Sequence, residues 1–124
     1  MTIAHSASMQ DFVNWPDLMM RVEGDPELAN ELFALFDQEL PPLRAQLREA
    51  FDREDWMETQ RLAHKLKGML ANLSVYRGAD IALKIETDSR AGDVLRIGGA
   101  VEAFDWELDQ FLPVLRAYLS GQTQ

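Results

Sequence analysis

Cysteine is absent from the 124 residues, so neither a disulfide nor a thiolate metal site can form. The sequence also lacks an apolar run near the ~20 residues of a membrane-spanning helix. Its first ten residues do not have the basic and apolar segments of a signal peptide. Basic residues are few, because 12 Lys and Arg stand against 21 Asp and Glu, which gives a net charge of −9. Nucleic-acid phosphates require a basic surface. We therefore expect a soluble, cytoplasmic protein that binds neither nucleic acid nor a membrane.

The alternation of apolar and polar residues that is typical of strands is also missing, whereas apolar residues recur at helical spacing along most of the chain. This spacing predicts a short helix near residues 15–22 and four long helices with the bounds 26–51, 56–74, 75–91 and 93–119. Long helices with short connections predict an all-α fold, an antiparallel four-helix bundle with a short extra N-terminal helix. We expect one domain over residues 11–120, after a flexible lead-in over residues 1–10.

Several large side chains and two prolines bear on the packing of these helices. Pro41-Pro42 interrupts the first long helix, but apolar residues resume directly after it, which predicts a kink rather than a break. Four large apolar residues are interpreted as core or packing residues: Met19, Met20, Trp56 and Trp106.

The candidate for chemistry is His64, in the second long helix. Helical residues advance by about 100° each. With His64 at zero, four apolar residues fall between roughly 140° and 200°, and Leu70 lies just beyond them; the four are Leu62, Leu66, Met69 and Leu73. His64 therefore points away from the predicted buried stripe, and we expect an exposed imidazole.

The residues around His64 on the exposed face are polar or small: Gln60, Arg61, Lys67, Gly68 and Ala71, with Lys65 further round. This segment is positive in an acidic protein, which suits an incoming phosphoryl group or the acidic surface of a partner. Gly68 is unusual, because a glycine inside a helix costs about 1 kcal/mol relative to alanine. We interpret it as room for another surface to approach His64.

Residues 63–68, Ala-His-Lys-Leu-Lys-Gly, and residues 71–73, Ala-Asn-Leu, resemble the signature of histidine-containing phosphotransfer (HPt) domains. The resemblance extends over residues 12–119. The sequence departs from the family pattern at Ser74-Val75, where the family usually has Gly-Ala.

The resemblance implies a phosphorelay intermediate. His64 would accept a phosphoryl group from the aspartyl phosphate of one receiver domain and pass it to the aspartate of another. Lys67 would stabilise the transferring phosphoryl oxygens, and five residues would dock the partner: Gln60, Arg61, Lys65, Gly68 and Ala71. The expected partners are receiver domains and a hybrid sensor histidine kinase. The Mg²⁺ would belong to the receiver, so we expect no metal and no cofactor in this chain. The chain would be a monomeric carrier and not an enzyme.

Two residues of the next helix, Glu86 and Arg90, are further candidates for the site. The family often has a polar residue at the position of Glu86 that hydrogen-bonds near the acceptor. A simple salt bridge between helices is the alternative interpretation of Glu86.

Two other functions are open at this stage. A helical adaptor with this fold would bind a receiver domain or a kinase without carrying phosphate, and His64 would then be dispensable. An enzyme is disfavoured, because the two histidines are far apart and no pair of carboxylates has the spacing of metal ligands. A histidine kinase would need a separate nucleotide-binding domain, for which 124 residues leave no room.

Overall fold

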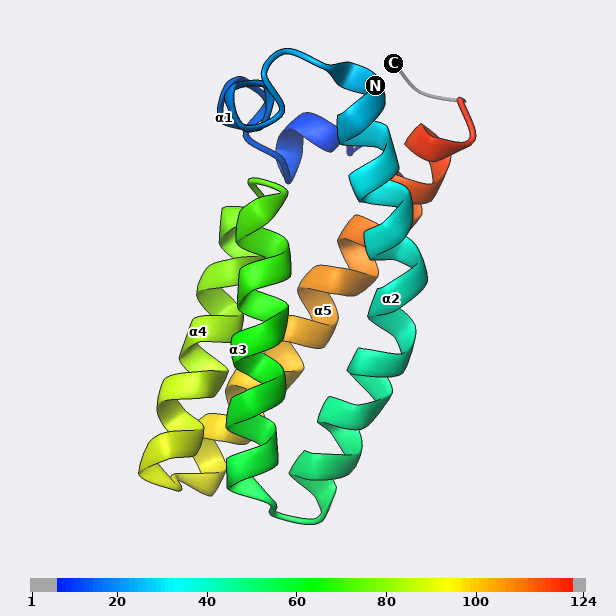
Figure 1. Ribbon diagram of the computed structural model, residues 1–124. Helices are drawn as coiled ribbons and strands as arrows, with labels where there is room; N and C mark the ends of the chain where they lie inside the picture. Colours follow the sequence, from blue (N-terminus) through cyan, green and yellow to red (C-terminus); the bar gives the residue numbers. More distant parts are fainter. Residues whose placement is uncertain (1–6, 122–124) are drawn as a thin grey trace, which may run out of the picture.

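The computed structural model describes residues 7–121, and every regular element within them is helical. The all-α prediction is confirmed, and the observed helix bounds lie within two residues of the expected ones. In order, the elements are a 3-10 turn η1 (Met9–Asp11), a short helix α1 (Trp15–Arg21) and four long helices, α2 (Pro26–Asp52), α3 (Trp56–Asn72), α4 (Tyr76–Ala91) and α5 (Val94–Leu119) (Figure 1).

Short polar side chains determine where the long helices begin. Asp25, Asp55 and Asp93 precede α2, α3 and α5, and each carboxylate accepts a hydrogen bond from a backbone N–H of the first turn. Gly92 ends α4 with a φ of 69°, a left-handed conformation that glycine adopts without strain. Local sequence signals are therefore sufficient to set these boundaries.

The connection between α3 and α4 differs from the expected one, which had α3 continuing to Ser74. Ser74 has a φ of 59°, and α3 ends two residues earlier at Asn72. The Ser74 side chain is buried, and its hydroxyl donates a hydrogen bond of 2.7 Å to Asp17 of α1. This bond offsets part of the cost of a left-handed residue other than glycine, and it ties α1 to the end of the α3–α4 pair.

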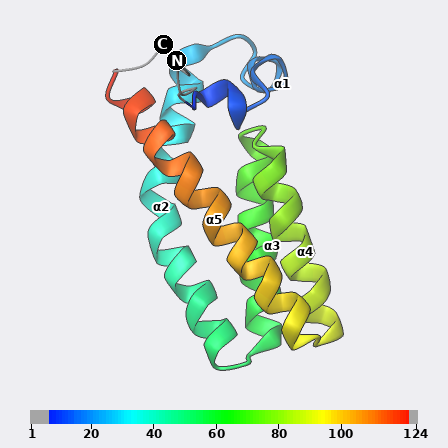
Figure 2. The same cartoon turned by 180° about the vertical axis from the view of Figure 1, so that it is seen from behind.

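The four long helices lie side by side, with α1 and η1 across one end (Figures 1 and 2). Helix α3 packs against α2 and α4, and α5 packs against the same two helices. Helices α3 and α5 are therefore diagonally opposite, and α5 is nearest to the viewer in Figure 2. Between the long helices, the side chains of Phe33 (α2), Leu66 (α3) and Phe104 (α5) are fully buried. Helix α2 continues through Pro41-Pro42 as one helix.

Three large apolar side chains lie elsewhere than expected. Met9 falls within the predicted lead-in but is buried against the core, whereas residues 1–6 of that lead-in lie outside the described residues. The core prediction is wrong for Met20 and for Trp106, which is 62% exposed. Trp106 lies on the side of α5 opposite the buried Phe104 and Leu108, so the packing of α5 against the core leaves Trp106 exposed. Met19 and Trp56 do pack against the core. Over residues 7–121, no helix has the length and apolar character to cross a membrane.

Candidate functional site

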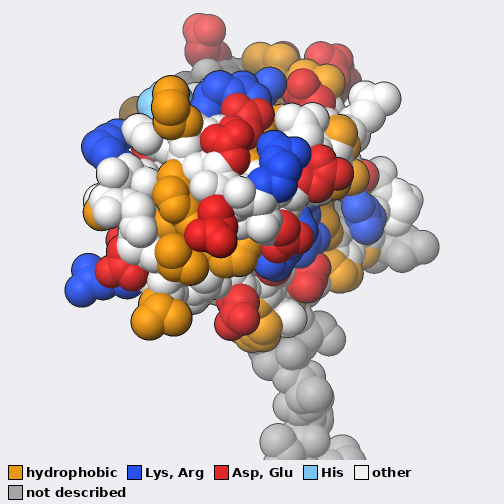
Figure 3. Space-filling model, turned by 90° about the horizontal axis from the view of Figure 1, so that it is seen from below, with side chains coloured by type: hydrophobic (Ala, Val, Ile, Leu, Met, Phe, Trp, Pro, Cys, Tyr) orange, Lys and Arg blue, Asp and Glu red, His pale blue; other side chains and the backbone are white. Residues whose placement is uncertain are grey.

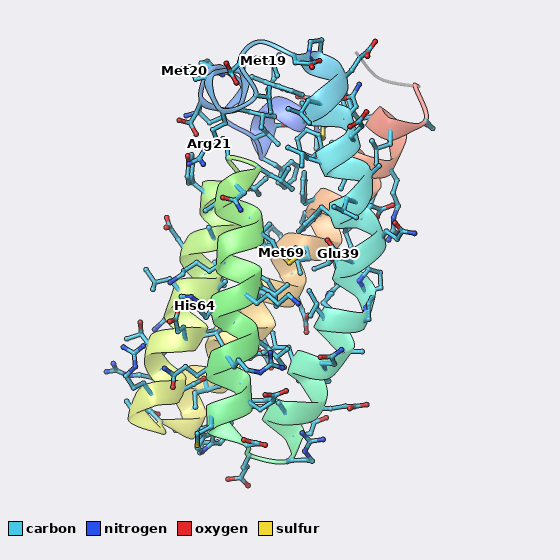
Figure 4. All side chains as sticks on the ribbon, viewed as in Figure 1. Met19, Met20, Arg21, Glu39, His64 and Met69 are labelled. Atoms are coloured by element: carbon cyan, nitrogen blue, oxygen red, sulfur yellow. The ribbon has the colours of Figure 1, made fainter. Side chains whose placement is uncertain are left out.

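His64 lies on the exposed side of α3, where α3 meets α4 (Figure 4). Its side chain is 67% exposed, and Figure 3, which views the molecule from the end where α2 connects to α3, shows histidine at the surface. The opposite side of α3 is buried through five residues: Thr59, Leu62, Ala63, Leu66 and Leu70. Packing of that stripe fixes the rotation of α3, and with it the outward direction of His64.

A buried carboxylate holds the imidazole from α4. His64 Nδ1 lies 3.0 Å from Oε2 of Glu86, whose side chain is only 9% exposed. The other carboxylate oxygen, Oε1, forms an ion pair of 2.9 Å with Lys67 Nζ. Glu86 therefore joins the two residues of α3 that the sequence singled out as acceptor and phosphate-stabilising residue.

The charge on Glu86 determines which imidazole nitrogen carries the proton. Burial raises the pKa of the Glu86 carboxyl, but contacts with Lys67 and His64 outweigh burial and hold this pKa below its usual value of 4.5. An ionised carboxylate can only accept a hydrogen bond, so Nδ1 of a neutral His64 carries the hydrogen. The lone pair then lies on Nε2, on the exposed side of the ring.

Arg90 and Gln60 complete the polar cluster around Glu86. The Arg90 guanidinium lies 3.6 Å from Glu86 Oε2. With its amide oxygen turned toward Arg90, Gln60 accepts two hydrogen bonds of 3.1 Å from Nε and Nη2. Of the two further candidates of α4, Glu86 thus contacts His64 directly, and Arg90 contacts Glu86. The structure also unites the two interpretations of Glu86, which binds the histidine and forms a salt bridge between helices.

Comparison with known families identifies this arrangement. The family described as the Hpt domain matches residues 31–118, more than two thirds of the chain, and the match includes His64, Lys67 and Glu86. The chain belongs to the Hpt domain family. This confirms the resemblance inferred from the sequence. Neither a curated protein nor a solved structure gave a match. Hpt domains take part in the phosphorelays of two-component signalling, where they interact with receiver domains and kinases as carriers of phosphoryl groups.

The remaining residues predicted for partner contact lie around the histidine of this Hpt domain. Arg61 is exposed and is engaged with Glu58 of its own helix through two hydrogen bonds of 2.7 Å. Lys65 is exposed, and Ala71 is half-buried. A Cβ added to Gly68 would have no neighbour within 4 Å among the described residues. Packing among residues 7–121 therefore gives no reason for a glycine at position 68.

Met57 also borders the histidine, and it was not predicted from the sequence. A shallow depression of about 480 Å³ beside the ring is lined by five residues: Met57, Gln60, Arg61, His64 and Glu86. Met57 is 85% exposed. It precedes His64 by seven residues, or nearly two helical turns, which places both on one face. This spacing was available in the sequence. In the part of the chain described, residues 7–121, no group of three or more His, Cys, Asp or Glu side chains has the arrangement of a metal site.

Proposed function

We propose that this Hpt domain is a cytoplasmic, monomeric intermediate of a phosphorelay. His64 takes a phosphoryl group from the aspartyl phosphate of one receiver domain and gives it to the aspartate of another. The observation that carries the proposal is the exposed imidazole held at Nδ1 by a buried, ionised carboxylate. Such a ring is fixed in orientation and keeps the Nε2 lone pair available as a nucleophile.

Each transfer exchanges one bond to phosphorus for another. The Nε2 lone pair attacks phosphorus, the N–P bond forms, and the bond from phosphorus to the aspartyl oxygen breaks. The aspartate leaves as a carboxylate, and attack by the second aspartate reverses these events. The imidazole of phosphorylated His64 can retain its Nδ1–H, which Glu86 continues to accept. Phosphoryl transfer depends chiefly on in-line positioning and on stabilisation of charge, and the metal site is that of the receiver.

Lys67 and the residues around His64 have separate roles in this proposal. Lys67 lies on the same side of α3 as His64 and holds its ammonium group at the buried carboxylate, from where it stabilises the phosphoryl oxygens. Partner contact is assigned to five residues: Gln60, Arg61, Lys65, Gly68 and Ala71. In this proposal the four long helices are arranged as an antiparallel four-helix bundle, which gives these side chains a rigid support.

Incubation with phosphorylated receiver domains tests the proposal. We expect the chain to acquire acid-labile, base-stable phosphate, which is characteristic of phosphohistidine. His64→Gln should abolish the labelling while the far-UV circular dichroism spectrum stays unchanged. Labelling that persists in His64→Gln would refute His64 as the acceptor. Receiver binding without labelling of the wild-type chain would favour the helical adaptor.

A further inference from the structure

The side of α5 that faces away from the core presents two large apolar side chains to solvent. Leu95 is 89% exposed and Trp106 is 62% exposed. They are 11 residues apart, which is close to three helical turns or ~16 Å, so both lie on the same face. Because α5 is diagonally opposite α3, this face points away from the face that carries His64 (Figure 2). Large apolar side chains aligned along one helical face are the kind of anchors by which helices pack against a partner.

A glycine between these two residues, Gly99, has no role in packing within residues 7–121. A Cβ at Gly99 would have no neighbour within 4 Å among the described residues, whereas a Cβ at Gly98 would lie 3.4 Å from the Phe51 ring. Gly98 thus adjoins a side chain of α2, but Gly99 faces open space. A glycine within a helix lowers its stability by about 1 kcal/mol. A glycine at position 99 is explained if the backbone of another molecule comes close to α5 between Leu95 and Trp106.

The charge of this face selects the kind of partner. Between Leu95 and Trp106 the acidic residues are Glu102 and Asp105, and the one basic residue, Arg96, is paired with Asp93 at 3.4 Å. Asp105 and Asp109, along one edge, are engaged with Arg44 of α2. Glu102 is exposed between Leu95 and Trp106, and within residues 7–121 no basic side chain forms an ion pair with it. We call Leu95, Gly99, Glu102 and Trp106 the α5 stripe.

A second copy of the chain, a membrane and a nucleic acid fit the α5 stripe poorly. Two copies would bring two Glu102 carboxylates together, and the chain as a whole carries a net charge of −9. Stable dimers bury roughly 800 Å² per partner, which two apolar side chains on one ridge do not supply. Anionic lipids and nucleic-acid phosphates would meet the same negative charge.

We propose that the α5 stripe is a docking surface for an amphipathic helix of a partner protein. Apolar side chains of that helix lie against Leu95 and Trp106, its backbone approaches at Gly99, and a Lys or Arg pairs with Glu102. Recognition of this kind uses apolar residues spaced along one helical face, with charge setting specificity. Docking here leaves His64 free, so a partner can retain the Hpt domain while receiver domains come and go on the opposite side. The proposal goes beyond phosphotransfer and does not depend on it.

Two synthetic helical peptides with the same leucine face test this surface. One carries Lys and the other Glu at the positions that flank the leucines, and binding is followed by tryptophan fluorescence and by chemical shifts of α5. We expect the Lys peptide to bind the wild-type chain at least tenfold more tightly than the Glu peptide. Glu102→Lys should remove this preference, and Leu95→Ser should weaken binding at least tenfold.

Glu31→Lys is the matched control, because it changes the net charge equally at an exposed residue of α2 and should keep the preference. Equal binding of the Lys peptide to wild type, Glu102→Lys and Leu95→Ser would overturn the proposal, as would failure of this peptide to bind. A wild-type dimer in sedimentation that Leu95→Ser abolishes would overturn it in favour of a second copy. Labelling of His64 should be unchanged in all three variants, so this proposal and the phosphotransfer proposal fail separately.

Discussion

Lys67-Gly68 on α3 and Arg77-Gly78 on α4 are two cation–glycine pairs with different surroundings. Lys67 reaches the buried Glu86 of α4 at 2.9 Å, and Arg77 reaches the buried Glu107 of α5 at 2.7 Å. Both pairs thus join neighbouring helices through an ion pair to a buried carboxylate.

The two regions differ in what else each group contacts. Glu86 is shared with an exposed imidazole, whereas the cation bound to Glu107 also lies over the ring of the buried Phe12, at 5.3 Å from its centroid. A Cβ at Gly68 would meet open space, but a Cβ at Gly78 would lie 3.3 Å from Leu70 Cδ1. A buried acid with a cation therefore does not by itself indicate a functional site. The region around Glu86 is distinguished by the exposed imidazole that Glu86 orients and by the free space at Gly68.

The largest effect is expected from removing each glutamate. Glu86→Ala should lower the rate of transfer to His64 by about 10- to 100-fold, because the imidazole loses the acceptor that fixes its tautomer and orientation. Glu107→Ala should leave that rate within about twofold and lower the free energy of unfolding by about 1–3 kcal/mol. Initial rates with a phosphorylated receiver domain and urea unfolding measure the two quantities.

Glu86→Gln serves as the conservative control for this comparison. Glutamine offers an amide oxygen to the Nδ1–H of His64, so most of the transfer rate should return. An equal loss of transfer in folded Glu86→Ala and Glu107→Ala would remove the distinction between the two regions.

A smaller effect is expected from removing each cation. Lys67→Ala should slow transfer about tenfold at saturating receiver, because a charge near the phosphoryl oxygens stabilises the transition state. Receiver affinity should fall less than the rate. Arg77→Ala should change neither the transfer rate nor the receiver affinity. Single-turnover rates and affinities at two ionic strengths separate the two roles. If Lys67 only steers the receiver toward His64, high salt should reproduce the effect of Lys67→Ala in the wild type. Equal saturated rates for the wild type and Lys67→Ala would exclude a role in transfer.

The pH dependence of stability sharpens the same comparison. Because the pKa of Glu86 in the folded chain lies below 4.5, folding favours its ionised form. This contribution is present above about pH 4.5 and is lost as the pH falls through the folded-state pKa. The wild type should therefore be more stable than Glu86→Gln at pH 7, and the difference in the free energy of unfolding should narrow as the pH falls below about 4.5. Urea unfolding of both proteins at pH 7 and at several pH values below 4.5 measures this difference. A difference that widens on acidification would contradict the negative charge assigned to Glu86.

The features of the fold that depend on local rules were predicted from the sequence. Helical periodicity and capping residues such as Asp55 gave the helix bounds, and the same period placed His64 opposite the buried stripe of α3. The contact between His64 and Glu86 joins residues 22 positions apart on different helices. It depends on the rotation and axial shift of α4 against α3, which no local pattern specifies. The exposure of Trp106 was missed for a different reason: its size suggested burial, although its angular position opposite Phe104 and Leu108 could be read from the sequence.

The smallest change is a single methyl group at each glycine. Gly68→Ala should raise the free energy of unfolding by up to about 1 kcal/mol, because alanine favours the helix and its Cβ meets nothing within 4 Å in the described structure. Gly78→Ala has the same helix propensity, but its Cβ would press on Leu70, which is fully buried and has little room to move. It should therefore be less stable than Gly68→Ala.

Thermal and urea unfolding of the two variants provide the test, and transfer rates add the functional half of the comparison. Gly68→Ala should be more stable yet transfer somewhat more slowly, because the added methyl group stands where the receiver approaches His64. Gly78→Ala should keep the wild-type rate, since its methyl group lies inside the fold. A destabilised Gly68→Ala would mean that position 68 is needed for packing, and the open space beside His64 would then have no bearing on docking.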